Sequence, residues 1–205
     1  MNAYFPIMLF ALSMSVTPGP NNIMLMTSAM NHGIKKSLPH YVGIIVGFPI
    51  MFMASGLGLS TVFTEYPIIH EVIRIVGIFY LLFLSWIIAT STNASLNSEK
   101  KKPFSFIQAA LFQWVNPKAW VLVTGAIATY TSTSSEITQQ IIIMALVFLI
   151  IGTVSVGLWL FFGNVIRRMF TKSSHRRIFN ITMAFLLLAS IIPTIEEVFS
   201  QYTLS

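Results

Sequence analysis

The chain has 205 residues, of which 55% are hydrophobic and only 9% are charged, and its formal net charge is +6. A soluble domain carries roughly 25% charged residues because its surface faces water, so this composition excludes an ordinary soluble domain. The chain has no cysteine, which excludes disulfides, thiolate metal sites and cysteine-based redox chemistry.

Six apolar stretches are each long enough for a membrane-spanning helix, which needs about 20 largely apolar residues. In chain order they are Tyr4–Met30, Leu38–Phe63, Pro67–Ser91, Phe104–Thr129, Ile137–Ile166 and Ile178–Phe199. They are apolar all round, which favours helices over the short alternating strands of a β-barrel. We therefore predict an all-α fold, a polytopic membrane bundle of six transmembrane helices, with residues 1–205 forming a single transmembrane transporter domain. No cleavable signal peptide is expected, because Met1–Tyr4 lacks a basic segment.

Basic residues gather in alternate loops of this arrangement. They are Lys35, Lys36, Lys100, Lys101, Lys102, Arg167, Arg168, Lys172, Arg176 and Arg177. The positive-inside rule places these loops in the cytoplasm and both termini on the outer side of the membrane. The charge therefore indicates topology in a lipid bilayer, and no nucleic-acid partner is expected.

The two halves of the chain are similar around two prolines. The spacing between Phe5, Thr17 and Pro18 in the first half is repeated in the second half by Phe104, Asn116 and Pro117. We infer two repeats, about residues 1–92 and about residues 104–205. With three spans in each half, the second repeat enters from the opposite side, and this 3+3 inverted repeat is common in secondary transporters. The alternative is two unrelated proline kinks, which transmembrane helices tolerate.

The segment Thr17-Pro18-Gly19-Pro20-Asn21-Asn22 predicts a broken helix near the middle of the membrane. Its prolines lack an N–H and clash with the preceding turn, and Gly19 permits unusual backbone angles. A second half-helix starting around Asn21 would direct free N–H groups and a positive dipole end at a carboxylate. Uncovered carbonyls on the other side would suit an ammonium group, so the break matches a zwitterionic amino acid. The alternative is a purely structural kink.

Asn116-Pro117-Lys118 is the matching segment of the second half. Lys118 is the basic residue that lies well inside a span, where a charge is costly and normally faces a cavity or a partner. The chain has no Asp, and no Glu lies in mid-span, so we expect a cavity or backbone carbonyls around Lys118. Lys118 could bind a carboxylate, change protonation during transport, or snorkel to the surface.

Residues beside the second break could line a pocket. They are Gln113, Trp114 and Trp120, although membrane tryptophans more often serve in packing or at the interface. Glycines elsewhere, among them Gly43, Gly47, Gly152 and Gly157, are interpreted as helix-packing positions. The predicted substrate-binding set is Thr17, Pro18, Gly19, Pro20, Asn21, Asn22, Gln113, Asn116, Pro117 and Lys118. No metal site, cofactor site or catalytic constellation is expected, so an enzyme is disfavoured.

These motifs resemble the LysE/RhtB family of amino-acid exporters. The resemblance lies in Thr17–Ile23, His32-Gly33 and Phe112–Lys118, while Ile88–Ser91, Lys102-Pro103 and Ser105-Phe106 resemble the branch containing the cysteine/O-acetylserine exporters. It covers essentially the whole chain. It implies export of small amino acids across the bacterial cytoplasmic (inner) membrane, driven by proton antiport, with a site at Pro18, Gly19, Pro20, Asn21, Asn116, Pro117 and Lys118.

One departure from the family concerns acidic residues. Many members carry one in the second span and one in the fifth, whereas this chain has Val46–Pro49 and Ile151–Thr153 in the corresponding regions. A neutral substrate, of the cysteine/O-acetylserine or homoserine/threonine type, therefore fits better than lysine. The coupling ion and the oligomeric state, including a homodimer, stay open. The alternative function is a non-transporting membrane scaffold or assembly subunit.

Overall fold

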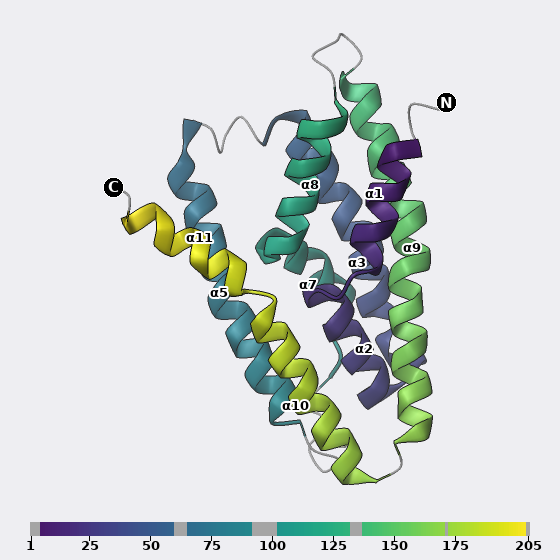
Figure 1. Cartoon of the computed structure of the whole chain (residues 1–205). Helices are drawn as coiled ribbons and strands as arrows, with labels where there is room; N and C mark the ends of the chain where they lie inside the picture. Colours follow the sequence, from purple (N-terminus) through teal and green to yellow (C-terminus); the bar gives the residue numbers. More distant parts are fainter. Residues whose placement is uncertain (1–4, 60–64, 92–101, 132–136, 171, 204–205) are drawn as a thin grey trace.

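A computed structural model describes residues 5–59, 65–91, 102–131, 137–170 and 172–203, and the regular structure in these ranges is entirely helical (Figure 1). The elements are α1 (Phe5–Val16), α2 (Pro20–His32), α3 (Ile34–Ala54), a π-helical turn (Ser55–Leu59), α5 (Pro67–Ala89), α7 (Phe106–Phe112), a 3-10 turn (Gln113–Val115), α8 (Pro117–Tyr130), α9 (Ile137–Met169), α10 (Ser173–Ala189) and α11 (Ile192–Thr203). The predicted all-α fold is confirmed. Met1–Tyr4, residues 60–63 of the second predicted span, Lys100 and Lys101 lie outside the described residues.

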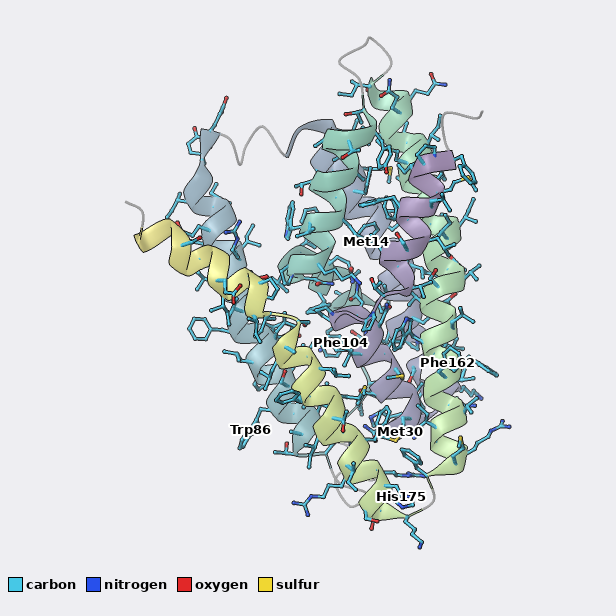
Figure 2. All side chains as sticks on the ribbon, in the orientation of Figure 1. Met14, Met30, Trp86, Phe104, Phe162 and His175 are labelled. Carbon is cyan, nitrogen blue, oxygen red and sulfur yellow. The ribbon has the colours of Figure 1, made fainter. Side chains whose placement is uncertain are left out.

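Several of these helices are suited to cross a membrane. Four segments of the described chain are long and apolar enough, namely Ile34–Gly58, Glu71–Ala89, Ile137–Met169 and Ser173–Glu196. Two shorter apolar helices, Phe5–Val16 and Phe106–Val115, belong to the first and fourth predicted spans. Large apolar side chains such as Trp86, which is 70% exposed, project outward from the bundle, as lipid contact requires (Figure 2). The prediction of a helical bundle with several membrane-spanning helices is therefore confirmed.

The first and fourth predicted spans are broken, as their prolines indicated. Figure 1 shows α1 continued by α2 on one side of the bundle interior, and α7 continued by α8 in the opposite direction. The second half-helices begin at Pro20 and Pro117, where the missing N–H would have had no helical partner anyway. The spacing in the sequence instead predicted that Pro18, and not Pro20, is the position equivalent to Pro117. The difference arises because three residues link α1 to α2, whereas Asn116 alone precedes α8.

Three details of the structure differ from the predicted spans and loops. Gly33 alone joins α2 to α3, at a φ of 84° that favours glycine, so Lys35 and Lys36 lie in the first turn of α3 and not in a loop. The sixth predicted span corresponds to the apolar segment Ser173–Glu196, but its helix is interrupted after Ala189, because the ring of Pro193 would clash with the Ala189 carbonyl in a continuous helix. The fifth span is longer than predicted, since α9 continues to Met169.

The core consists of packed clusters on either side of the helix breaks. One contains Phe52, Trp120 and Phe148, from α3, α8 and α9. Another contains Phe112 and Phe179, with residues of α2 and α5. Helices α1, α2 and α3 all pack against α9, while α10 packs against α5. Gly19 of the first break and Asn116 of the second are therefore buried among long helices, while Thr17 and Pro18 are exposed.

Two of the predicted packing glycines permit close helix contact, and one does not. A Cβ on Gly47 would lie 2.6 Å from Ala110 Cα, and a Cβ on Gly43 would lie 2.6 Å from Ala109 Cβ, so both glycines hold α3 against α7. The packing interpretation is wrong for Gly152, because a Cβ there would meet no atom within 4 Å. Gly152 instead faces open space inside the bundle.

Candidate functional site

The first helix break is an extended link between α1 and α2. Gly19 has a φ of −172° and a ψ of 176°, which any residue adopts, so the break does not depend on unusual glycine angles. What glycine provides is space, because a Cβ at Gly19 would lie 2.6 Å from Lys118 Cδ. No side chain caps the N-terminus of α2, so its first N–H groups and its positive dipole end face the break.

Lys118 reaches from the start of α8 across to the end of α1. Its Nζ donates hydrogen bonds to Thr17 O at 2.9 Å, to Thr17 Oγ1 at 2.8 Å and to Pro18 O at 3.3 Å. Of the options left open by the sequence, backbone carbonyls are therefore the partners of the ammonium, and it does not snorkel to the surface. This contact joins the two broken helices although the residues are about a hundred positions apart in the chain.

The carbonyls at the end of α1 are covered, which corrects the expectation that they are free for a ligand. Asn22 Nδ2 donates to Ser15 O and to Thr17 O, both at 2.9 Å. Trp159 Nε1 donates to Val16 O at 3.2 Å. Because a helix end within the hydrocarbon region of a membrane has no water to satisfy its carbonyls, the chain supplies these donors itself.

A pair of side-chain amides forms a second link between the broken helices. Asn21 Nδ2 donates to Gln113 Oε1 at 2.8 Å, and Gln113 Nε2 donates back to Asn21 Oδ1 at 3.2 Å. Gln113 Nε2 also donates to Ala109 O at 2.8 Å, and Gln113 is fully buried. At the start of α8, Asn116 Oδ1 accepts the Lys118 backbone N–H at 3.2 Å and so caps the helix.

A cavity of about 70 Å³ lies at the break, between α1, α2, α3, α8 and α9. Five residues of the predicted set line it: Gly19, Asn21, Asn22, Asn116 and Lys118. The others are close but are not part of the lining. Thr17 and Pro18 bind the Lys118 ammonium, Gln113 pairs with Asn21, and Pro20 and Pro117 begin helices α2 and α8.

The apolar walls of the cavity were missed by sequence reasoning. They include Phe48 and Pro49 from α3, and Phe148 and Gly152 from α9. The one usable signal was the departure from the family pattern, because Phe48, Pro49 and Gly152 lie in the two regions where acidic residues were expected and are missing. Trp114 and Trp120 do not line this cavity. Trp120 Nε1 donates to Trp114 O at 2.8 Å, so the packing alternative applies to this pair.

The cavity is electropositive and small. Among the described residues that line it, Lys118 is the one titratable side chain and none carries a carboxylate. The uncapped N-terminus of α2 adds partial positive charge at the same place. A volume of about 70 Å³ has room for roughly five water-sized groups. The site therefore suits a carboxylate carrying a short uncharged side chain, and disfavours a long cationic one.

The described residues contain no group of three or more His, Cys, Asp or Glu side chains that could hold a metal ion. The two breaks and the cavity lie within residues 12–190, which match the family described as LysE type translocator. A cysteine/O-acetylserine efflux protein of Salmonella choleraesuis is 31% identical over 179 residues, which are 87% of this chain and 90% of that protein. A protein of the same name from Escherichia coli is 29% identical over 179 residues, with the same coverage. No solved structure matches the chain.

Proposed function

Because the chain belongs to the LysE type translocator family, whose members are transporters and not enzymes, we propose that it exports small neutral amino acids or their derivatives from the cytoplasm. The candidate substrates are of the cysteine/O-acetylserine type, in keeping with the names of its relatives, or of the homoserine/threonine type. The observation that carries the proposal is the cavity at the break, where the Lys118 ammonium has carbonyl partners but no carboxylate.

In the proposed bound state, the substrate carboxylate lies between the Lys118 ammonium and the N-terminus of α2. The side-chain oxygens of Asn22 and Asn116 offer acceptors for the substrate ammonium, since an amide oxygen has two lone pairs. The short side chain of the substrate packs against Phe48 and Phe148. The remaining residues of the predicted binding set hold these groups in place.

The proposed transport cycle is alternating access by a 3+3 inverted repeat with six spans. In each half, the broken helix counts as one span: α1 with α2, and α7 with α8. The basic helix ends face the cytoplasm and both termini lie outside, as the positive-inside rule requires. The Lys118–Thr17 contact links the two halves at the cavity, so a carboxylate that competes for Lys118 weakens this link.

Proton antiport is part of the proposal. Since Lys118 is the one titratable group in the cavity lining, it is the group through which protons and substrate would be coupled there.

The test is an amino-acid efflux screen in cells that overproduce the protein, with and without a proton gradient. The wild-type chain should export a small neutral amino acid, and collapse of the gradient should stop export. Lys118→Ala and Asn21→Ala should abolish export while the protein still inserts into the membrane. Wild-type efflux that both variants leave unchanged would reject the site. Absence of efflux for every amino acid would favour the scaffold alternative.

A further inference from the structure

A second cavity, of about 270 Å³, lies between α2, α3 and α5. Phe104, which lines it, is half-buried and packs against the core cluster that contains Phe112 and Phe179. The exposed residue Lys102 also lines it, so the cavity opens toward the basic end of the molecule. Its lining is more polar than a packing defect between apolar helices would be, and includes Thr27, Ser28 and His40.

Two side chains of this lining have buried polar atoms with no partner. His40 is 1% exposed, and neither of its ring nitrogens has a hydrogen-bond partner. Thr27 is 3% exposed, and its hydroxyl also has none. Buried polar groups are nearly always paired in native proteins, because an unpaired one loses its hydration without compensation. These atoms therefore point to a polar partner that binds in the cavity.

The neighbouring polar groups are paired within the protein. The Ser28 and Ser37 hydroxyls lie 2.8 Å apart, and Asn31 Nδ2 donates to Asn180 Oδ1 at 3.1 Å. Asn180 Nδ2 also donates to Ser91 O at 3.2 Å. The wall of the cavity is thus an ordered network, and the unpaired atoms are confined to the two side chains named above.

The mouth of the cavity is positively charged. Lys102 lines it, and none of the described residues in its lining is an Asp or a Glu. His32 also lines it, and burial, then the charges of the nearby Lys36 and Arg167, lower the pKa of His32, so the positive charge at this end comes from the lysine and arginine side chains. A positive opening raises the local concentration of anionic groups, here a carboxylate, and steers them inward.

We propose that this second cavity is a loading site, which binds the transported amino acid before it reaches the helix break. The carboxylate lies at the mouth near Lys102, while the Thr27 hydroxyl and the His40 imidazole bind the substrate ammonium and polar side chain. Asn22 lines the first cavity and Thr27 lines the second, on the same helix and five residues apart. At 1.5 Å per residue the two positions are about 8 Å apart along α2, so the two cavities lie close to each other along the same helix. This inference rests on the proposed export function.

The chain has no cysteine, so a single introduced thiol can be labelled without background. In Thr27→Cys, a small methanethiosulfonate reagent should label the cavity in membrane vesicles. O-Acetylserine and homoserine, added in turn, should slow labelling, roughly tenfold at ten times the dissociation constant. A cysteine at the lipid-facing position Trp86 is the control and should show no protection. Absence of labelling at Thr27→Cys, or labelling that neither compound slows, overturns the loading site.

Two further variants separate this site from the first cavity. Adding Lys118→Ala to Thr27→Cys should leave the protection in place, and loss of protection would show that the effect originates at the helix break. His40→Phe keeps a ring beside Phe104, at present 5.1 Å away between centroids, and removes the unpaired nitrogens. It should raise thermal stability while abolishing protection and slowing export. His40→Phe with normal export and protection overturns the site.

The same measurements distinguish failure of the loading site from failure of the export function. Wild-type efflux without protection at position 27 rejects the loading site alone. Absence of wild-type efflux for every amino acid rejects the export function and the loading site with it.

Discussion

Replacing Lys118 by methionine tests the cavity directly, because it removes the ammonium and keeps a side chain of similar length. The change deletes the hydrogen bonds to Thr17 and Pro18, at 2.8 to 3.3 Å. The Thr17 carbonyl retains its hydrogen bond from Asn22, at 2.9 Å. Charged hydrogen bonds contribute about 1.5–3 kcal/mol each, but removing a partly buried cation without a carboxylate partner also relieves several kcal/mol of desolvation. We therefore expect the stability to change by no more than about 1 kcal/mol, or 2–4 °C in the unfolding midpoint.

The effect on the substrate should be much larger. An ammonium and a carboxylate about 4 Å apart attract each other by about 4 kcal/mol at an effective dielectric constant of 20. Because 1.4 kcal/mol corresponds to a tenfold change, Lys118→Met should weaken binding by roughly a thousandfold. Export at ordinary cytoplasmic substrate levels should then be undetectable.

The assay combines O-acetylserine efflux from cells at graded internal concentrations with direct binding to the purified protein. Lys118→Arg retains the charge and should keep part of the activity, although its planar head group fits the carbonyls differently. Lys35→Met is the matched control, because Lys35 is exposed on the first turn of α3, and its export should equal that of the wild type. A folded Lys118→Met protein that binds substrate within about threefold of the wild type would refute the electrostatic reasoning.

The remaining predictions concern the packing and the protonation of neighbouring groups. Gly19→Ala should sharply reduce export, because its Cβ would lie 2.6 Å from the cavity lysine. Gly125→Ala should export normally, because Gly125 does not line the cavity and its Cβ would meet only Phe10, at 4.0 Å; equal efflux of the two variants would contradict this. Asn21→Ala should lower the free energy of unfolding by about 1–3 kcal/mol, because it leaves the buried Gln113 amide without one of its hydrogen-bond partners. In thermal unfolding, the double variant Asn21→Ala with Gln113→Ala should lose less stability than the sum of the two single variants. Burial and then neighbouring cations lower the pKa of His32, so the unfolded chain binds the proton more readily than the folded one. The free energy of unfolding in detergent should therefore be highest above pH 6.5 and should fall as the pH drops below it. A His32→Gln variant whose free energy of unfolding falls with pH as steeply as that of the wild type would refute this.

Much of the fold could be predicted because lipid imposes strong constraints on sequence. A span must be apolar over its whole length, so α5 was predicted within two residues of its observed end at Ala89. A proline inside a span must disturb the helix, so the breaks at Pro18–Pro20 and at Pro117 were also predictable. The break after Ala189 was missed, although Pro193 was visible by the same rule.

The sequence by itself determined that this chain is a helical membrane protein, where two of its helices break and which residues at the breaks are polar. Only the tertiary structure decided that Lys118 binds the end of α1, that Asn21 pairs with Gln113, and that Phe48 and Gly152 line the cavity. The physical reason is that helices in lipid are apolar on every side, so the residues facing a cavity look the same in sequence as those facing lipid. Contacts between residues about a hundred positions apart follow from packing, which no local pattern contains.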